Sequence, residues 1–233
     1  MIKIYGRNSL YEAVRYKAPI KNIILSDTVL KKDNKIIELI KDNGYKYEIK
    51  PNSFFNNEKN SQGYIAYRED YKTYNIEDLT SFKKDLGRVV ILDGVVDPHN
   101  YGAILRSAEC FGYDLVILPN NRSCPLSETV VHVSEGAVEH IKIMYVNSLQ
   151  NALKILKDIG YWIVSTDMNG TSRFSDIKKD TSLAIVIGNE GKGISAEVSA
   201  MVDSRITIPN IGGTCESLNA AIATAIICSE FYR

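Results

Sequence analysis

Apolar and polar residues alternate along the whole chain in a way that predicts strands followed by helices. Two short apolar runs, residues 89–92 and 183–187, contain only Val, Ile, Leu and Ala. Such runs are typical of central strands that are buried on both faces of a sheet. Because helical patterns follow most of the predicted strands, we expect an α/β fold whose back half is a parallel sheet covered by helices on both faces.

The front half repeats the alternation on a smaller scale and predicts a small α/β domain over residues 1–70. The polar stretch 71–85 has weak periodicity and predicts a linker, and residues 86–233 predict the larger domain. The apolar pattern of residues 30–43 predicts one helix that ends at Gly44. Four strands are expected in this domain, at residues 2–5, 23–25, 45–49 and 61–69.

The stretch RVVILDGVVDPHNYGAILRSAECFG opens the larger domain and predicts a strand, a loop and a helix. Pro98 cannot continue a preceding helix and Asn is a good cap, so the helix is expected to start near Asn100 and to end at Gly112. Further strands are expected at residues 115–118, 141–146, 161–165 and 204–208, and further helices at 129–134, 148–160, 195–202 and 217–231.

Three glycine-bearing loops follow predicted strands of this domain, with the sequences DGVVDPHNYG, GNEGKG and PNIGGTCESLN. The carboxyl ends of parallel strands meet at one edge of a sheet, and ligands bind there in α/β folds. Side chains able to bind a ligand lie in or just after each loop. We expect one cleft to be formed by Asn100, Arg106, Glu190, Ser217 and Asn219.

Several of these residues also have a purely structural interpretation. Arg106 and Glu109 have the spacing of an ion pair on a solvated helix face, and Ser217 is a common helix N-cap. Residues 188–195 match neither the phosphate-binding pattern GxxxxGK[ST] nor the dinucleotide pattern GxGxxG. The pattern alone therefore leaves both the structural and the functional interpretation open.

The composition and the spacing of cysteine and histidine indicate the protein's redox state, its location and whether it binds a metal. The 233 residues have a net charge of zero, and the four cysteines lie far apart with no CxxC pair. The three histidines form no ligand-spaced cluster with them. We therefore expect a cytoplasmic protein with reduced thiols and no metal. No apolar run has the length of a signal-peptide core or a membrane span.

The three loop segments carry a resemblance to a known family. In order and spacing LDGVVDPHNYGAILRSAECFG, AIVIGNEGKGIS and IPNIGGTCESLNAAIATAI resemble the three motifs of the SpoU (TrmH-like) class of AdoMet-dependent RNA ribose 2′-O-methyltransferases. IYGRNSLYEAV and SQGYIAY in the front half are similar to the RNA-binding domain of that group. The two-domain layout is similar to that of the enzymes that methylate a guanosine of large-subunit ribosomal RNA.

The resemblance implies a fold, a cofactor and a partner. It implies a trefoil knot in the C-terminal part, bent AdoMet held there, and a homodimer in which the partner helps to complete the active site. It matches Asn100 and Arg106 to motif one, Glu190 to motif two, and Ser217 and Asn219 to motif three, all as catalytic residues. The AdoMet-contacting positions that it implies are Gly188, Ile208, Leu218 and, beside them, Thr166.

Charge favours RNA contact by the front half. Residues 1–75 contain 14 Lys and Arg against 9 Asp and Glu, whereas the rest contains 14 against 19. A basic front half is suited to phosphates, and its tyrosines are suited to stacking on unpaired bases; a solvated charged face is the alternative. The basic residues that we expect to bind RNA are Arg7, Arg15, Lys17, Lys31 and Lys32.

One departure from the family pattern keeps a competing function open. Between Pro209 and Ser217 the chain has the seven residues NIGGTCE, one more than is usual in the family. The first hypothesis is a ribosomal RNA 2′-O-methyltransferase, and a transfer RNA target is an alternative of the same class. The alternative of a different class is a non-catalytic RNA-binding or ribosome-assembly factor that has lost AdoMet through the longer loop.

Overall fold

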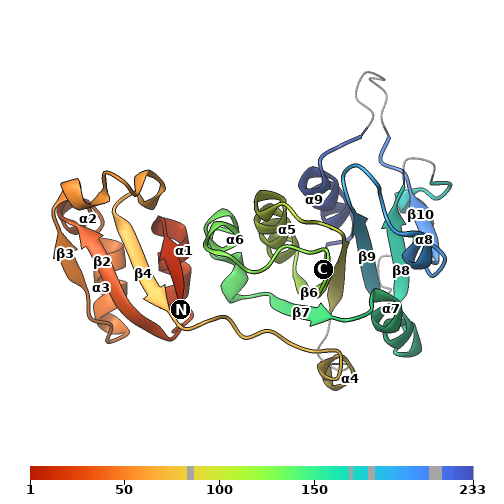
Figure 1. Ribbon diagram of the computed structural model, residues 1–233, viewed down its shortest axis with the longest axis horizontal. Coiled ribbons are helices and arrows are strands. Elements are labelled where there is room, and N and C mark those ends of the chain that lie inside the picture. Colours follow the sequence, from red (N-terminus) through yellow and green to blue (C-terminus); the bar gives the residue numbers. More distant parts are fainter. Residues whose placement is uncertain (83–86, 168–169, 178–181, 210–216, 233) are drawn as a thin grey trace. The chain divides into compact units, whose positions relative to one another are not determined.

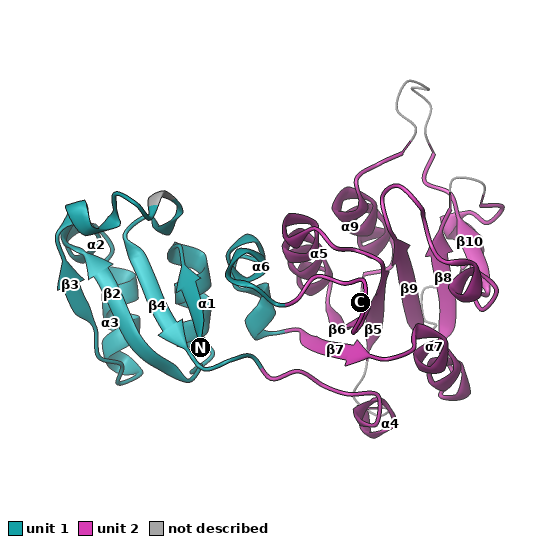
Figure 2. Ribbon diagram, viewed as in Figure 1, with its two compact units in different colours: residues 1–71, 126–140 teal, residues 72–125, 141–233 magenta. Residues whose placement is uncertain are grey.

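The computed structural model spans residues 1–233 and describes all of them except 83–86, 168–169, 178–181, 210–216 and 233. The chain forms two compact units (Figure 2). Unit 1 contains residues 1–71 and 126–140, and unit 2 contains residues 72–125 and 141–233. Each unit has its own sheet (Figure 1).

Unit 1 is built on a mixed four-stranded sheet in the order β1-β4-β2-β3. Strands β2 and β3 pair in parallel, whereas β1 with β4 and β4 with β2 pair antiparallel. Buried side chains of the strands and helices, among them Ile4, Leu10, Ile23 and Ile36, form its core. The elements of this sheet and its helices are β1 (Ile2–Tyr5), α1 (Arg7–Arg15), β2 (Ile20–Ser26), α2 (Asp27–Lys32), α3 (Asn34–Asp42), β3 (Glu48–Lys50), η1 (Asn52–Phe55), η2 (Lys59–Ser61) and β4 (Tyr64–Arg68).

The single helix predicted over residues 30–43 is wrong, because two helices, α2 and α3, occupy this region. Asp33 separates them with the non-helical angles φ −121° and ψ 68°, and its side chain accepts a hydrogen bond from the Ile36 amide. It therefore serves as the N-cap of α3. The first of the two helices starts earlier than predicted because Ser26 caps it through the Val29 amide.

Residues 126–140 pack within unit 1, although they follow a strand of unit 2 in the sequence. They form α6 (Glu128–Val133) and η4 (Ala137–Glu139). Ser9 donates from Oγ to the Val131 carbonyl at 3.3 Å, and the Tyr5 ring stacks on His132 with the centroids 4.3 Å apart. These contacts join residues that are more than 100 positions apart, so no local pattern predicts them.

Unit 2 contains a six-stranded sheet that is parallel throughout, in the order β10-β8-β9-β5-β6-β7. The chain moves outward in one direction from β5 to β7, whereas β9 lies on the other side of β5. This reversal between β5 and β9 is the position where open α/β sheets bind ligands. The strands are β5 (Arg88–Asp93), β6 (Tyr113–Pro119), β7 (Lys142–Val146), β8 (Trp162–Thr166), β9 (Leu183–Gly188) and β10 (Ser204–Ile206).

Helices cover both faces of this sheet, as predicted. Side chains of α4 (Asp78–Ser81), α7 (Leu149–Asp158) and α8 (Ala196–Ser199) join one buried cluster with residues of five of the strands. The helices α5 (Pro98–Cys110) and α9 (Ala220–Glu230) pack against each other and against strands β6 and β9. The short 3-10 helix η5 (Phe174–Asp176) lies between β8 and β9 in the sequence.

The fold class is confirmed, whereas the trefoil knot stays a prediction because the C-terminal part includes residues outside the described ranges. Within those ranges no helix has the length and apolarity needed to cross a membrane. The described residues also contain no group of three or more His, Cys, Asp and Glu suited to a metal ion.

Candidate active site

Two polar side chains from separate segments of unit 2 meet at Oε1 of Glu190. Asn100 Nδ2 donates to this oxygen at 2.8 Å, and Asn219 Nδ2 donates to it at 2.7 Å. Asn219 Nδ2 also donates to Oδ1 of Asn100 at 2.7 Å. The second carboxylate oxygen, Oε2, makes no hydrogen bond or ion pair with the described residues. The backbone amide of Ala220 donates to the same oxygen, Oε1, at 3.4 Å. Two side-chain amides and one backbone amide thus hold one oxygen of Glu190 and leave the other able to bind a ligand.

The start of α5 brings Asn100 to this position, and the predicted start near Asn100 is wrong by two residues. Pro98 is the first helical residue, a position where the missing N–H of proline costs nothing. Asp97 is the N-cap, and its carboxylate accepts from the amides of His99 and Asn100. Because Asp97 caps the helix, the buried side chain of Asn100 is available to bind Glu190.

Asn219 has a second function as the N-cap of α9. Its Oδ1 accepts from the backbone amides of Ala221 at 2.9 Å and Ile222 at 3.3 Å, while its Nδ2 donates to Asn100 and Glu190. The cap position that the sequence suggested for Ser217 is therefore occupied by Asn219. A cap of this kind fixes the carboxamide with one end toward the helix and the other toward the carboxylate.

Two residues that sequence reasoning missed tie the first two loops together. Asp93, at the end of β5, accepts from both the amide and the hydroxyl of Ser195 at 2.7 Å. Asn189 donates from Nδ2 to the Gly94 carbonyl at 2.9 Å, and its Oδ1 accepts from the amides of the two residues after Glu190. The available signal for both was a polar residue where a buried strand ends: Asp93 is the last residue of β5 and Asn189 directly follows β9.

A cavity of about 760 Å³ lies beside Glu190. Its lining contains all four residues that the family resemblance implied for AdoMet: Thr166, Gly188, Ile208 and Leu218. A Cβ atom at Gly188 would lie 2.3 Å from the carbonyl carbon of Gly193, so the backbone can approach this closely only at a glycine. Backbone atoms thus form part of the wall. Other members of the lining are Asp167, Ile187, Asn189, Ile194, Thr207, Pro209 and Ser217.

The remaining two predicted catalytic residues lie in different surroundings. Ser217 is exposed and lines the cavity. Arg106 is exposed on α5 and has no ion pair or hydrogen bond with the described residues, so the alternative of an ion pair with Glu109 is not formed there. The lengthened loop, residues 210–216, falls outside the described residues.

The basic residues of the front half differ in how free they are to bind RNA. Arg7 donates to both oxygens of Asp33, at 2.6 and 3.3 Å, and Arg15 lies 3.4 Å from Glu12. Lys31 and Lys32 are exposed at the end of α2 and form no ion pair with a described residue. Lys17 is exposed and has a positive φ of 57°. Lys17, Lys31 and Lys32 are therefore the members of this set that are exposed and form no ion pair with the described residues.

Two family models together match nearly the whole chain. The model described as SpoU rRNA Methylase family matches residues 87–229. The model described as RNA 2'-O ribose methyltransferase substrate binding matches residues 3–73. The first range contains all six strands of the unit 2 sheet, and the second contains the four strands of unit 1 except the first residue of β1.

Relatives and solved structures agree with these matches. A protein of Staphylococcus saprophyticus named putative TrmH family tRNA/rRNA methyltransferase is 37% identical over all of this chain and 95% of its own length. A putative RNA methyltransferase of the TrmH family from Porphyromonas gingivalis is 25% identical, with a TM-score of 0.71 over 99% of this chain and 89% of that one. AviRb, a SpoU methyltransferase from Streptomyces viridochromogenes solved in complex with AdoMet, shares the fold, with a TM-score of 0.80, 20% identity, and coverage of 98% and 88%. The chain belongs to the SpoU family of RNA methyltransferases.

Proposed function

We propose that this chain transfers a methyl group from AdoMet to a ribose 2′-hydroxyl of RNA, and that the target is a guanosine of large-subunit ribosomal RNA. The observation that supports this most is the meeting of Asn100, Glu190 and Asn219 beside a cavity lined by the four residues expected to contact AdoMet. A cytoplasmic location and the division into residues 1–70, 71–85 and 86–233 are part of the same proposal.

The cavity suits AdoMet in size and chemistry. Its volume lies within the range of small-molecule sites, about 300–1,000 Å³. Ile187, Ile194 and Pro209 provide apolar surface, and Thr166 and Thr207 provide hydroxyls. When bound, AdoMet supplies a methyl group on a sulfonium sulfur. Gly188, Ile208 and Leu218 would hold it, largely through their backbones.

The residues around Glu190 would position the acceptor ribose. Methyl transfer is an in-line displacement, so catalysis depends strongly on alignment of the reacting atoms. The free Oε2 of Glu190 would accept a hydrogen bond from the ribose hydroxyl, while Asn100 and Asn219 hold the carboxylate in place. Arg106 would bind the neighbouring phosphate through its guanidinium, and Ser217 would contact the ribose. A guanidinium stays protonated in proteins, so Arg106 orients the substrate in this proposal.

A homodimer is also proposed. On α9 the side chain of Ile222 is 53% exposed, and that of Leu218, just before the helix, is 45% exposed. A second copy that covers these side chains would remove apolar surface from water and bring additional residues to the cavity that Leu218 lines. Sedimentation of the wild type and of I222E tests this: a dimer is expected for the first and a monomer for the second.

RNA affinity is assigned to unit 1, with Lys31 and Lys32 among its phosphate-binding residues. The double variant K31Q/K32Q is expected to bind single-stranded RNA more weakly and to lower the salt slope by about 1.4, since each phosphate contact contributes about 0.7. Lys154, exposed on α7 of unit 2, provides the control K154Q. An equal loss of RNA affinity in K154Q would show that Lys31 and Lys32 have no specific part in phosphate binding.

The decisive experiment maps 2′-O-methyl groups in ribosomal and transfer RNA from cells with and without this gene. Loss of one guanosine methyl from large-subunit ribosomal RNA is the expected result. Loss of a methyl group from transfer RNA instead would show that transfer RNA is the substrate. If no methyl group is lost, and calorimetry detects no AdoMet binding even with RNA present, the chain is a non-catalytic RNA-binding factor.

A further inference from the structure

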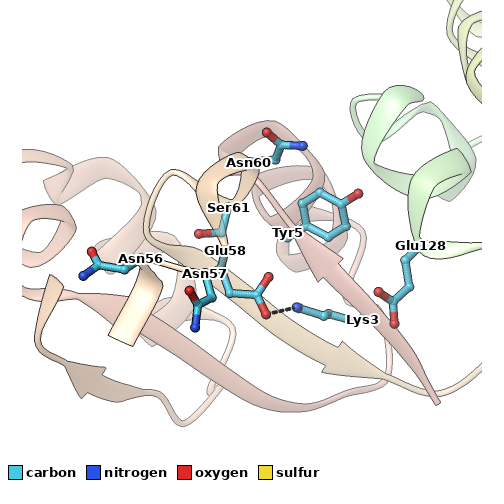
Figure 3. Close-up of a pocket in the computed structure, with 8 residues that line it drawn as sticks. All are labelled: Lys3, Tyr5, Asn56, Asn57, Glu58, Asn60, Ser61 and Glu128. Carbon is cyan, nitrogen blue, oxygen red and sulfur yellow. Dashed lines mark hydrogen bonds and ion pairs between the residues drawn. The ribbon is translucent and has the colours of Figure 1, made fainter. Parts of the chain in front are cut away.

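Unit 1 has a cavity of its own, separate from the methyltransferase site. Its volume is about 600 Å³. Figure 3 shows the side chains that line it. Lys3 and Tyr5 come from β1, and Glu128 comes from the first turn of α6. The remaining lining residues belong to the connection between β3 and β4: Asn56, Asn57, Glu58, Asn60 and Ser61.

The charges of this cavity disfavour a phosphate. Lys3 is the only cation among the described residues that line the cavity, and its Nζ lies 2.5 Å from Oε1 of Glu58. Glu128 adds a second carboxylate, so the lining has one positive and two negative charges. A phosphate would face a net negative wall, and its attraction to Lys3 would compete with an ion pair that already exists.

The cavity does offer hydrogen bonds to a neutral ligand. The side-chain amides of Asn56, Asn57 and Asn60 have no hydrogen bonds to the described residues, and each can donate and accept. Glu128 is exposed and forms no ion pair or hydrogen bond with those residues. An ionised carboxylate only accepts hydrogen bonds, so the ligand group that contacts it must be an N–H or O–H donor.

We propose that this cavity is a subsite for one unstacked nucleobase of RNA, and that Glu128 makes it select a base with an exocyclic amine over uracil. The ligand being RNA rests on the proposed function. Proteins recognise single-stranded RNA by hydrogen bonds to the edges of splayed bases, and carboxylates accept from the amine of cytosine. Uracil has a carbonyl at the corresponding position, and its oxygen would face the Glu128 carboxylate.

A simpler interpretation of Glu128 exists, because an acidic residue in the first turn stabilises a helix. That interpretation predicts no difference between bases. The ratio of affinities for two RNAs that differ only in the base separates the two interpretations, since a change in overall charge affects both RNAs equally.

The experiment uses the full chain without AdoMet and two fluorescein-labelled RNA decamers, C10 and U10, in fluorescence anisotropy titrations. The wild type is expected to bind C10 about tenfold more tightly than U10, the effect of one hydrogen bond to a charged group. E128Q is expected to reduce this ratio to about one. E38Q removes the same charge from an exposed position on α3 and is expected to keep the wild-type ratio.

A second variant guards against misfolding of the first. N57W places a large ring in the cavity, leaves Glu128 intact, and is expected to abolish the same preference. A wild-type ratio near one, or a tenfold ratio that persists in folded E128Q and N57W, overturns the subsite. Methyl transfer to ribosomal RNA is measured separately: methylation without base preference rejects the subsite alone, and base preference without methylation rejects the proposed function alone.

Discussion

Asn219 donates from Nδ2 to Oε1 of Glu190 at 2.7 Å, across 29 positions of sequence. The same side chain caps α9 through its Oδ1. One carboxamide thus links the position of a helix to the position of a carboxylate, and substitution can separate the two functions.

N219D is expected to keep the N-cap of α9 and to lose the hydrogen bond to Glu190. Its carboxylate can still accept from the Ala221 and Ile222 amides, so thermal stability stays near that of the wild type. Beside Glu190 it replaces a donor with a second negative charge, and methyl transfer is expected to fall by about a hundredfold. N219A loses both functions and about 1 kcal/mol of stability. Activity is measured by transfer of a labelled methyl group to ribosomal RNA. Activity of N219D near that of the wild type would show that methyl transfer does not need the hydrogen bond from Asn219 to Glu190.

Gly188 and Gly191 make a matched pair in one loop. G188A places a Cβ 2.3 Å from the Gly193 carbonyl carbon, so the loop must shift and the cavity wall with it. We expect AdoMet affinity to fall at least about tenfold. At Gly191 the nearest atom to a new Cβ, the Asn189 carboxamide oxygen, is 3.7 Å away, and G191A is expected to bind AdoMet like the wild type. Calorimetric titration measures the AdoMet affinity of both variants. Equal affinities would show that the backbone at Gly188 does not form part of the AdoMet-binding wall.

R106K tests the role given to the guanidinium. Lysine keeps the charge but cannot make the paired hydrogen bonds of arginine to a phosphate. Because Arg106 is exposed, stability should change by less than about 0.5 kcal/mol. AdoMet affinity is expected to stay unchanged while methyl transfer falls about tenfold or more. Methylation near the wild-type rate would exclude a bidentate role for this residue.

Sequence patterns located the buried strands well because burial on both faces leaves a continuous apolar run. Residues 2–5 form β1 as predicted, and the run 183–187 forms β9 with one residue added. The division of one predicted helix at Asp33 was missed because the apolar periodicity continues through the break. There a single carboxylate, which bonds to the Ile36 amide and to Arg7, decides the structure.

For the site, the order of the loops predicted that Asn100, Glu190 and Asn219 would lie together, and the structure brings them within hydrogen-bond distance. Their catalytic roles stay predictions. The packing of residues 126–140 within unit 1 was not predictable, because it depends on contacts between distant residues such as Arg68 and Glu139.

The buried ion pair of Arg68 with Glu139 is expected to stabilise this packing. The Arg68 side chain is 6% exposed and that of Glu139 is 2% exposed, and Tyr71 donates from its hydroxyl to Glu139 at 2.8 Å. E139A leaves a buried guanidinium without its carboxylate and is expected to cost about 3–5 kcal/mol in urea unfolding. R68M/E139L removes both charges and should recover most of this loss. A cost below about 1 kcal/mol for E139A would mean that the pair contributes little.

Asp33 should make the stability of unit 1 sensitive to acid. Burial raises the pKa of Asp33, but hydrogen bonds from Arg7, Tyr64 and the Ile36 amide outweigh it, so this pKa is lower in the folded protein than in the unfolded chain. Stabilisation by the ionised carboxylate is therefore fully present above the unfolded pKa, about 4, and is lost as the pH falls through the folded value.

D33N removes this contribution, so its unfolding free energy should decline less steeply than that of the wild type below about pH 4. D42N, at an exposed aspartate at the end of α3, should follow the wild type. Urea unfolding between about pH 2 and 6 measures all three proteins, and parallel declines for D33N and the wild type would show that Asp33 gains nothing from its partners.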